Sequence, residues 1–100
     1  MEPKQNLRLL VKTNKLFNLI VAIENNKTVR ELAHRILNCY IELAEEHEKG
    51  TTIPKKRDLE VSSIKFQNYF ISKEETVGSI LRDNDTIECI LVKAKPKYPK

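Results

Sequence analysis

The feature that most constrains this chain is an apolar hairpin that leads directly into a capped helix. Leu7, Leu9 and Val11 alternate with Arg8, Leu10 and Lys12, and this period of two predicts a half-buried strand. After the turn at 13–15, the apolar run 16–23 predicts a second strand. Thr28, followed three residues later by Glu31, forms a capping box that predicts the start of a helix. A strand, a turn, a strand and a helix in this order indicate an α+β fold.

The second strand is apolar on both of its faces. One face carries Phe17, Leu19, Val21 and Ile23, and the other carries Leu16, Ile20 and Ala22. A sheet with a helix on one side needs only one apolar face. The second face therefore has no evident reason to be apolar unless something covers it.

The predicted helix has one apolar stripe and an acidic end. The stripe repeats at three and four residues and consists of Val29, Leu32, Ala33, Ile36, Cys39, Tyr40 and Leu43. Gly50 is a plausible stop signal, so the helix is about twenty residues long. Its last turns carry Glu42, Glu45, Glu46 and Glu48, where the helix dipole disfavours anions. These glutamates are either a solvated face or a site for a basic partner.

The second half of the chain predicts further strands. A polar loop at 51–58 precedes one or two strands within 59–71, with Gln67-Asn68 as a possible tight turn. A short apolar turn at 76–81 and a polar turn at 82–85 lead to a closing strand at 86–92. We expect a mixed sheet of four to five strands with one long helix packed across one face. The expected domain is 1–93, followed by a basic Pro/Lys tail or linker at 94–100.

Composition limits the function. One hundred residues form one domain, and no apolar stretch approaches the roughly 18 residues that span a bilayer. The net charge of +4 is supplied by the four lysines of 93–100. The folded part is therefore nearly neutral, and its charge argues only weakly for binding to nucleic acid.

Cys39 and Cys89 fall in a predicted helix and a predicted strand, and we expect both to be buried free thiols. We expect an intracellular protein, cytoplasmic rather than nuclear.

Several segments resemble known families. Leu9-Leu10-Val11-Lys12-Thr13 and Thr28-Val29 are similar to the first hairpin and helix start of ubiquitin, and 86–91 resembles its last strand. This likeness implies a ubiquitin-like β-grasp. The chain ends in Lys-Pro-Lys-Tyr-Pro-Lys and not in Gly-Gly, so conjugation is not expected.

Within the β-grasp class, the sequence looks most like the PB1-like N-terminal self-association domain of Par-3 polarity scaffolds. The helix start at 28–32 with Tyr40-Ile41, and the stretch 71–91 with its Asp83-Asn84-Asp85 turn, carry this resemblance. Lys73 and Arg82 thin the family's acidic run, and the loop 51–59 is more basic than the family's. The segment 81–85 also resembles the coilin N-terminal domain.

Residues suited to catalysis or metal binding are sparse. His34 and His47 fall on the helix among charged residues, where surface histidines are typical. No nucleophile lies next to a base in a recognisable pattern, and no Cys-x-x-Cys, His-x-x-x-His or glycine-rich phosphate loop occurs. We expect no enzyme activity, no cofactor, no metal and no small-molecule substrate.

Two sets of charged residues suggest a protein partner. The basic set is Arg8, Lys12 and Lys15, and the acidic set is Glu74, Glu75, Asp83 and Asp85. On a β-grasp these sets can lie on different faces, which permits head-to-tail self-association. The alternative is that they are unrelated surface charges. The expected function is therefore a non-enzymatic interaction or self-association module, the N-terminal domain of a larger scaffold.

A different class of function remains open. Lys55, Lys56 and Arg57 form a compact basic cluster that could contact phosphate. With the basic tail, this cluster suits an RNA- or nucleoprotein-associated adaptor. Its nearest aromatic residues, Phe66 and Tyr69, are expected to serve the sheet and not to stack on bases.

Overall fold

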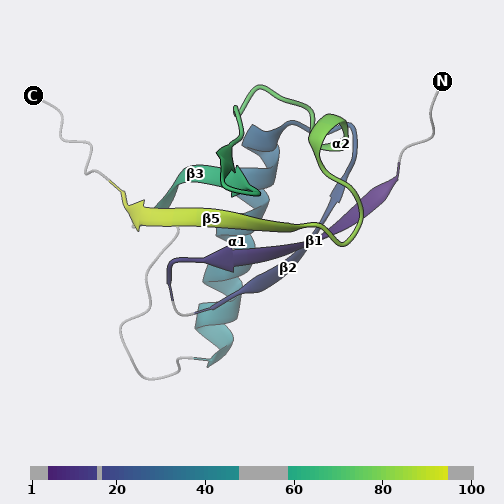
Figure 1. The fold of residues 1–100 in the computed structure, drawn as a ribbon. Coiled ribbons are helices and arrows are strands. Elements are labelled where there is room, and N and C mark those ends of the chain that lie inside the picture. Colours follow the sequence, from purple (N-terminus) through teal and green to yellow (C-terminus); the bar gives the residue numbers. More distant parts are fainter. Residues whose placement is uncertain (1–4, 16, 48–58, 95–100) are drawn as a thin grey trace, which may run out of the picture.

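The computed structural model describes residues 5–15, 17–47 and 59–94, and within them a five-stranded sheet is crossed by one long helix (Figure 1). The spatial order of the strands is β2-β1-β5-β3-β4. The central pair β1 and β5 is parallel, and the other neighbours are antiparallel. The elements are β1 (Asn6–Thr13), β2 (Leu19–Glu24), α1 (Val29–His47), β3 (Leu59–Phe66), β4 (Tyr69–Phe70), α2 (Val77–Ile80) and β5 (Thr86–Lys93). This mixed sheet confirms the predicted β-grasp.

The hairpin of β1 and β2 buries one face of each strand under the helix. Leu9 pairs with Val21 in the antiparallel register, and both side chains are buried. Leu7, Val11, Leu19 and Ile23 are buried on the same side, as the alternation predicted. Ile87, Cys89 and Leu91 of β5 continue this apolar layer across the sheet.

Helix α1 begins where the capping box predicted. The Thr28 hydroxyl accepts a hydrogen bond from the Glu31 N–H at 3.2 Å. The buried stripe differs from the predicted one, because Leu37, Ile41 and Ala44 are buried whereas Cys39 is only half-buried. Leu43 is likewise half-buried. The sheet buries two neighbouring residues at each turn of the helix. The stripe predicted from the spacing of apolar residues was rotated slightly away from these buried positions.

The chain between β3 and β5 contains one tight turn and one short helix. Gln67 and Asn68 both have positive φ, 52° and 70°, as the primed turns of two-residue hairpins require. The Ile71 N–H donates to the Ile64 oxygen at 2.9 Å and extends the pairing beyond β4. Strand β5 ends at Lys93, and residues 95–100 of the predicted tail lie outside the described residues.

A network of main-chain hydrogen bonds ties 73–78 to 25–30. The first two N–H groups of α1, at Val29 and Arg30, donate to the oxygens of Glu75 and Lys73 at 2.8 and 3.0 Å. In return, the N–H groups of Val77 and Gly78 donate to the oxygens of Lys27 and Asn25, both at 2.8 Å. We call this network the backbone clamp. It satisfies two of the four N–H groups that a helix start leaves unpaired.

We predict that Ile36→Ala destabilises the domain by about 2–5 kcal/mol. Ile36 lies between α1 and the sheet with no exposed surface, so its removal leaves a cavity in the core. Chemical denaturation of the two proteins measures the difference. A loss below about 1 kcal/mol would mean that this part of the core collapses around the smaller side chain.

We predict that Gly78→Ala costs about 1–3 kcal/mol, because overfilling a packed site forces the backbone to move. A Cβ at Gly78 would lie 2.7 Å from the main-chain oxygen of Asn25, the atom that accepts the Gly78 N–H. Ser79→Ala, at the exposed next position, is the control. Equal unfolding midpoints for the two variants would show that the clamp yields at little cost.

Candidate interaction surfaces

Helix α1 covers one face of the sheet (Figure 1), and the opposite face carries an exposed apolar patch. Ile20 on β2 is 65% exposed, and Leu10, its direct partner on β1, is 39% exposed. Together with Thr86 on β5 and Lys12 they line a shallow hollow of about 250 Å³. We call Leu10 and Ile20 the open-face patch. The apolar second face that the sequence left unexplained is therefore exposed, and no described residue covers it.

Two cations flank the open-face patch. Arg8 and Lys12 lie two residues before and after Leu10 on β1, and both are exposed on the same face. Lys12 is in register with Glu88 of β5, which is in register with Lys65 of β3. The third predicted basic residue, Lys15, lies in the turn after β1 and is exposed. The basic set therefore follows one strand and its turn.

The predicted acidic set serves the fold at three of its four positions. Asp83 accepts the Arg8 main-chain N–H at 2.8 Å, and Asp85 accepts the Arg82 N–H at 2.7 Å. Glu74 forms a salt bridge with Arg30 at the start of α1. Asp83 therefore lies next to Arg8, one of the cations from which we expected it to be separate. Glu75 is exposed and has no ion-pair partner among the described residues.

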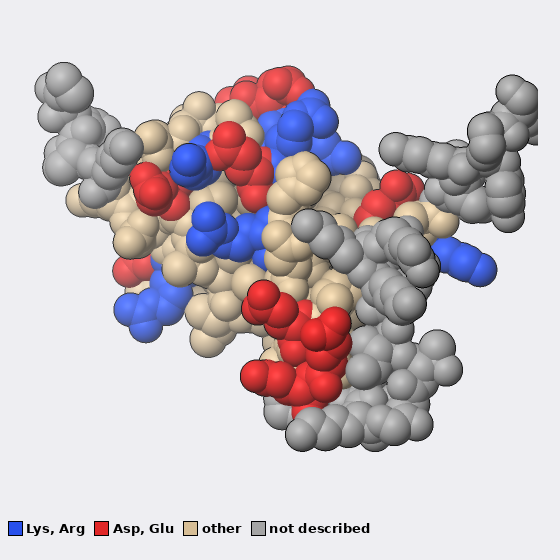
Figure 2. All heavy atoms as spheres, turned by 180° about the vertical axis from the view of Figure 1, so that it is seen from behind, with Lys and Arg blue, Asp and Glu red and all other residues tan. Residues whose placement is uncertain are grey.

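A second group of anions lies at the end of α1. Glu42, Glu45 and Glu46, on the last turns of α1, are exposed and form the acidic patch in the lower part of Figure 2. We call these three residues the helix-end patch. They belong to the helix layer, whereas the open-face patch belongs to the opposite side of the sheet. The alternative basic cluster of Lys55, Lys56 and Arg57 lies outside the described residues.

A groove beside β4 was not predicted. Tyr69 belongs to the sheet, as expected, and pairs with Phe66, but Tyr69 and Phe70 are 76% and 70% exposed. With Phe66, Ile71, Ile80, Glu75, Gln67 and Ser72 they line a groove of about 550 Å³. The Lys65 ammonium lies 5.0 Å from the centre of the Phe70 ring. Two consecutive aromatic residues directly after a tight turn were the sequence signal, because neighbours in a strand point to opposite faces.

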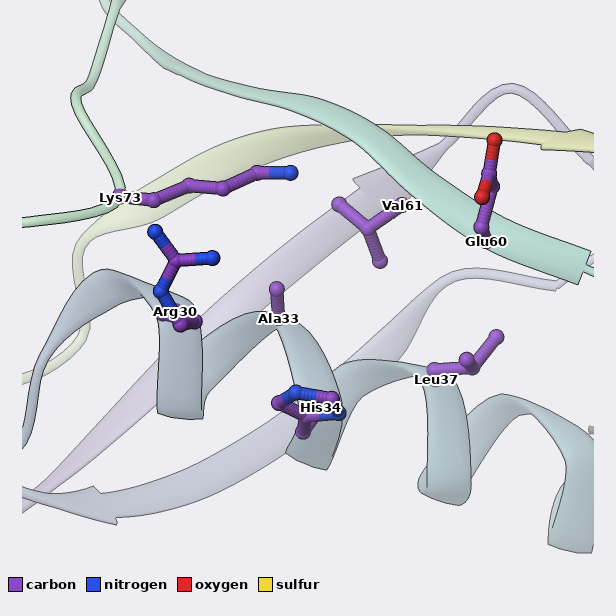
Figure 3. Close-up of a pocket in the computed structure, with 7 residues that line it drawn as sticks. All are labelled: Arg30, Ala33, His34, Leu37, Glu60, Val61 and Lys73. Atoms are coloured by element: carbon purple, nitrogen blue, oxygen red, sulfur yellow. The ribbon is translucent and has the colours of Figure 1, made fainter.

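A second hollow, of about 250 Å³, lies between α1 and β3 (Figure 3). Arg30 and Lys73 converge at one end, and Ala33 faces Val61 at its centre. Exposed His34 lies on its helix side, as a surface histidine should. The Arg30 charge is already compensated by Glu74, so this hollow is a weak candidate for an anion.

The cysteines fit a structural role. Both are free thiols, with Cys89 buried and Cys39 half-buried. Burial raises the pKa of Cys89 to about 12, and burial together with nearby Glu42 raises that of Cys39. A thiol is a poor nucleophile while it stays protonated.

Among the described residues, no three His, Cys, Asp or Glu side chains gather as metal ligands. No described helix is long and apolar enough to cross a membrane.

We predict that Cys89 in the native protein resists alkylation by iodoacetamide at pH 8 while Cys39 reacts slowly. The raised pKa keeps Cys89 protonated, and its burial blocks the reagent. Mass spectrometry of peptides from native and denatured samples measures the labelling. Equal native labelling of the two thiols would contradict the burial of Cys89.

Comparisons with known proteins define the class through the fold. No protein-family model matches the sequence, and no curated protein matches it. A chain from a structure described as "Molecular Mimicry of SUMO promotes DNA repair" is 19% identical, with a TM-score of 0.59 over 89% of this chain and 94% of that one. The likeness establishes a ubiquitin-like β-grasp domain.

Other chains with the same fold come from different systems. One belongs to a pParkin–pUb–UbcH7 complex, with 16% identity and a TM-score of 0.59, over 85% of this chain and 22% of that one. Another belongs to a toluene 4-monooxygenase complex with an inhibitor, with 11% identity and a TM-score of 0.60, over 86% and 98%. Identities this low establish the fold alone. Function must be argued from the surfaces.

Proposed function

We propose that this domain is a non-enzymatic protein-interaction module that self-associates through the open face of its sheet. The observation that carries the proposal is an exposed apolar pair, Leu10 and Ile20, between the cations Arg8 and Lys12. Exposed apolar side chains rimmed by polar residues are typical of protein interfaces. The chemistry that fits is a partner surface with apolar side chains and carboxylates.

The partner we propose is a second copy of this chain. Its helix-end patch of Glu42, Glu45 and Glu46 offers the carboxylates, with half-buried Leu43 between them in sequence. The open-face and helix-end patches lie on opposite layers of one molecule (Figures 1 and 2). Contact between unlike patches is heterologous and repeats head to tail. This proposal replaces the acidic partners Asp83 and Asp85 with glutamates that accept no described hydrogen bond from the backbone.

A self-associating domain of this kind suits the N-terminal region of an intracellular scaffold, because a repeating contact concentrates whatever is attached to it. The Par-3 likeness supports such a role. The proposal does not use the basic residues at 55–57, on which the RNA-adaptor alternative rests.

We predict that Lys12→Glu and the double variant Glu45→Lys/Glu46→Lys are each folded and monomeric. Each change places like charges across the proposed contact. An equimolar mixture should associate again, at least as a heterodimer, since the intact helix-end patch of Lys12→Glu still matches the intact open face of the double variant. Analytical ultracentrifugation over a concentration series, at low and high salt, measures the assembly, which salt should weaken.

Two further variants complete the experiment. Lys93→Glu makes the same charge change at the exposed end of β5 and should self-associate like the wild type. Ile20→Asp should weaken assembly without unfolding the domain, because Ile20 is mostly exposed. A wild-type chain that remains monomeric at millimolar concentration and low salt would refute self-association.

A further inference from the structure

Strand β4 lies at the edge of the described sheet, where its main chain has an open side. The Ile71 N–H donates to the Ile64 oxygen at 2.9 Å, so these two residues form a hydrogen-bonded pair of the β3–β4 ladder. Bonded and non-bonded pairs alternate along an antiparallel ladder. Phe70, in register with Lys65, therefore belongs to a non-bonded pair, and its N–H and C=O point away from β3. Unpaired groups at a sheet edge accept a further strand from a partner.

The two sides of β4 differ in what they offer to an added strand. Phe70 and Lys65 are in register on one side, where the Lys65 ammonium lies 5.0 Å from the centre of the Phe70 ring. Tyr69 and Phe66 are in register on the other side, and Ile71, two residues after Tyr69, shares that side. The Phe70 ring thus already has a cation over it, whereas the Tyr69 ring is 76% exposed. The Tyr69 side is the one that remains open to a ligand.

The groove beside β4 also contains one anion in a fixed position. Glu75 lines the groove together with the aromatic rings, and its main-chain oxygen accepts the Val29 N–H of the backbone clamp at 2.8 Å. The Glu75 carboxylate forms no ion pair with a described residue, whereas neighbouring Glu74 is paired with Arg30. A carboxylate beside open aromatic rings favours a cationic ligand and disfavours the phosphates of a nucleic acid.

Arginine is the side chain that uses both the ring and the carboxylate. Its guanidinium group is planar, stacks on aromatic rings, and pairs with a carboxylate through two parallel N–H groups. A lysine ammonium is a compact, strongly hydrated charge without this planar fork. Side chains alternate along a strand, so in a segment paired with Phe70 the residue next to the paired one points to the Tyr69 side. That neighbouring position is where an arginine enters the groove.

We propose that an arginine-containing segment of a partner protein adds to β4 as an extended strand. Its main chain exchanges hydrogen bonds with Phe70, and its guanidinium group stacks on Tyr69 and pairs with Glu75. This site goes beyond the proposed function, because it uses neither the open-face patch nor the helix-end patch.

A peptide titration of the full chain tests the site. The probe is acetyl-Thr-Val-Arg-Val-Thr-amide, added to the ¹⁵N-labelled protein up to millimolar concentration. We expect the amide signals of 66–71 and 75 to shift and those of β2 to stay in place. Hydrogen exchange at the Phe70 N–H should also become slower, because this group gains an acceptor from the added strand.

Two matched peptides test the guanidinium group. Citrulline in place of the arginine keeps the shape of the side chain without its charge, and the shifts should then be lost. Lysine in the same place keeps the charge without the planar fork, and this peptide should bind several-fold more weakly than the arginine peptide.

Variants of the protein test the two side chains of the groove. Glu75→Gln should weaken binding about tenfold, because it removes a charge-assisted hydrogen bond. Tyr69→Ala should also weaken it, and both positions are exposed, so the melting temperature should stay the same. Glu60→Gln, the same change at an exposed position of β3, should bind like the wild type. Lys12→Glu should do likewise, so failure of this site is distinguishable from failure of self-association.

Three results would overturn the proposal. The first is the absence of shifts at 66–71 and 75 with millimolar arginine peptide. The second is equal affinity for the arginine peptide and either matched peptide, or unchanged exchange at Phe70 in the bound protein. The third is a polyuridine RNA that shifts the same amides at lower concentration than the arginine peptide and loses affinity with Tyr69→Ala, which would assign the ring to base stacking.

Discussion

The backbone clamp between 25–30 and 73–78 is the constraint on which the rest of the structure depends. It joins the start of α1 to the segment between β4 and α2, and every donor and acceptor in it belongs to the main chain. Side-chain identity enters at Gly78, where a Cβ would meet the Asn25 oxygen. Because the clamp fixes the start of α1, it fixes which helix face lies on the sheet. The central parallel pair of β1 and β5 then encloses the core formed beneath that face.

The same constraint organises the surfaces. The clamp holds Glu75 by its main chain, and the turn at Gln67 and Asn68 holds the aromatic pair beside it. The groove thus stands on two rigid supports. The open-face patch has a different origin, because it lies on regular strands where β pairing alone sets the spacing of Leu10, Ile20 and Lys12. Two independent surfaces on one small domain allow two contacts to be made at once.

The carboxylates of this domain have two roles, in turns and on an exposed helix face, and their spacing in the sequence does not tell which role each one has. Asp83 and Asp85 accept main-chain N–H groups and hold the turn that leads into β5. Glu42, Glu45 and Glu46 accept no such bonds among the described residues and lie at a helix end whose dipole opposes them. A carboxylate used in a turn is costly to replace, whereas one on an open helix face is free to serve a partner. This difference selects the helix end as the acidic half of the proposed contact.

The sequence by itself determined the fold, because its signals were local. Alternation in β1, the helix cap by the Thr28 hydroxyl and the tight turn at Gln67-Asn68 each depend on residues close together in the chain, and each is present in the structure. Only the tertiary structure decided the surfaces. The hydrogen bond from the Arg8 main-chain N–H to the Asp83 carboxylate joins residues 75 positions apart, and it depends on how the turn before β5 packs against β1. The exposure of Tyr69 depends on β4 lying at the edge of the sheet that the described residues form. Periodicity shows which residues share one face of a strand, but packing between distant segments decides which of the two faces is covered.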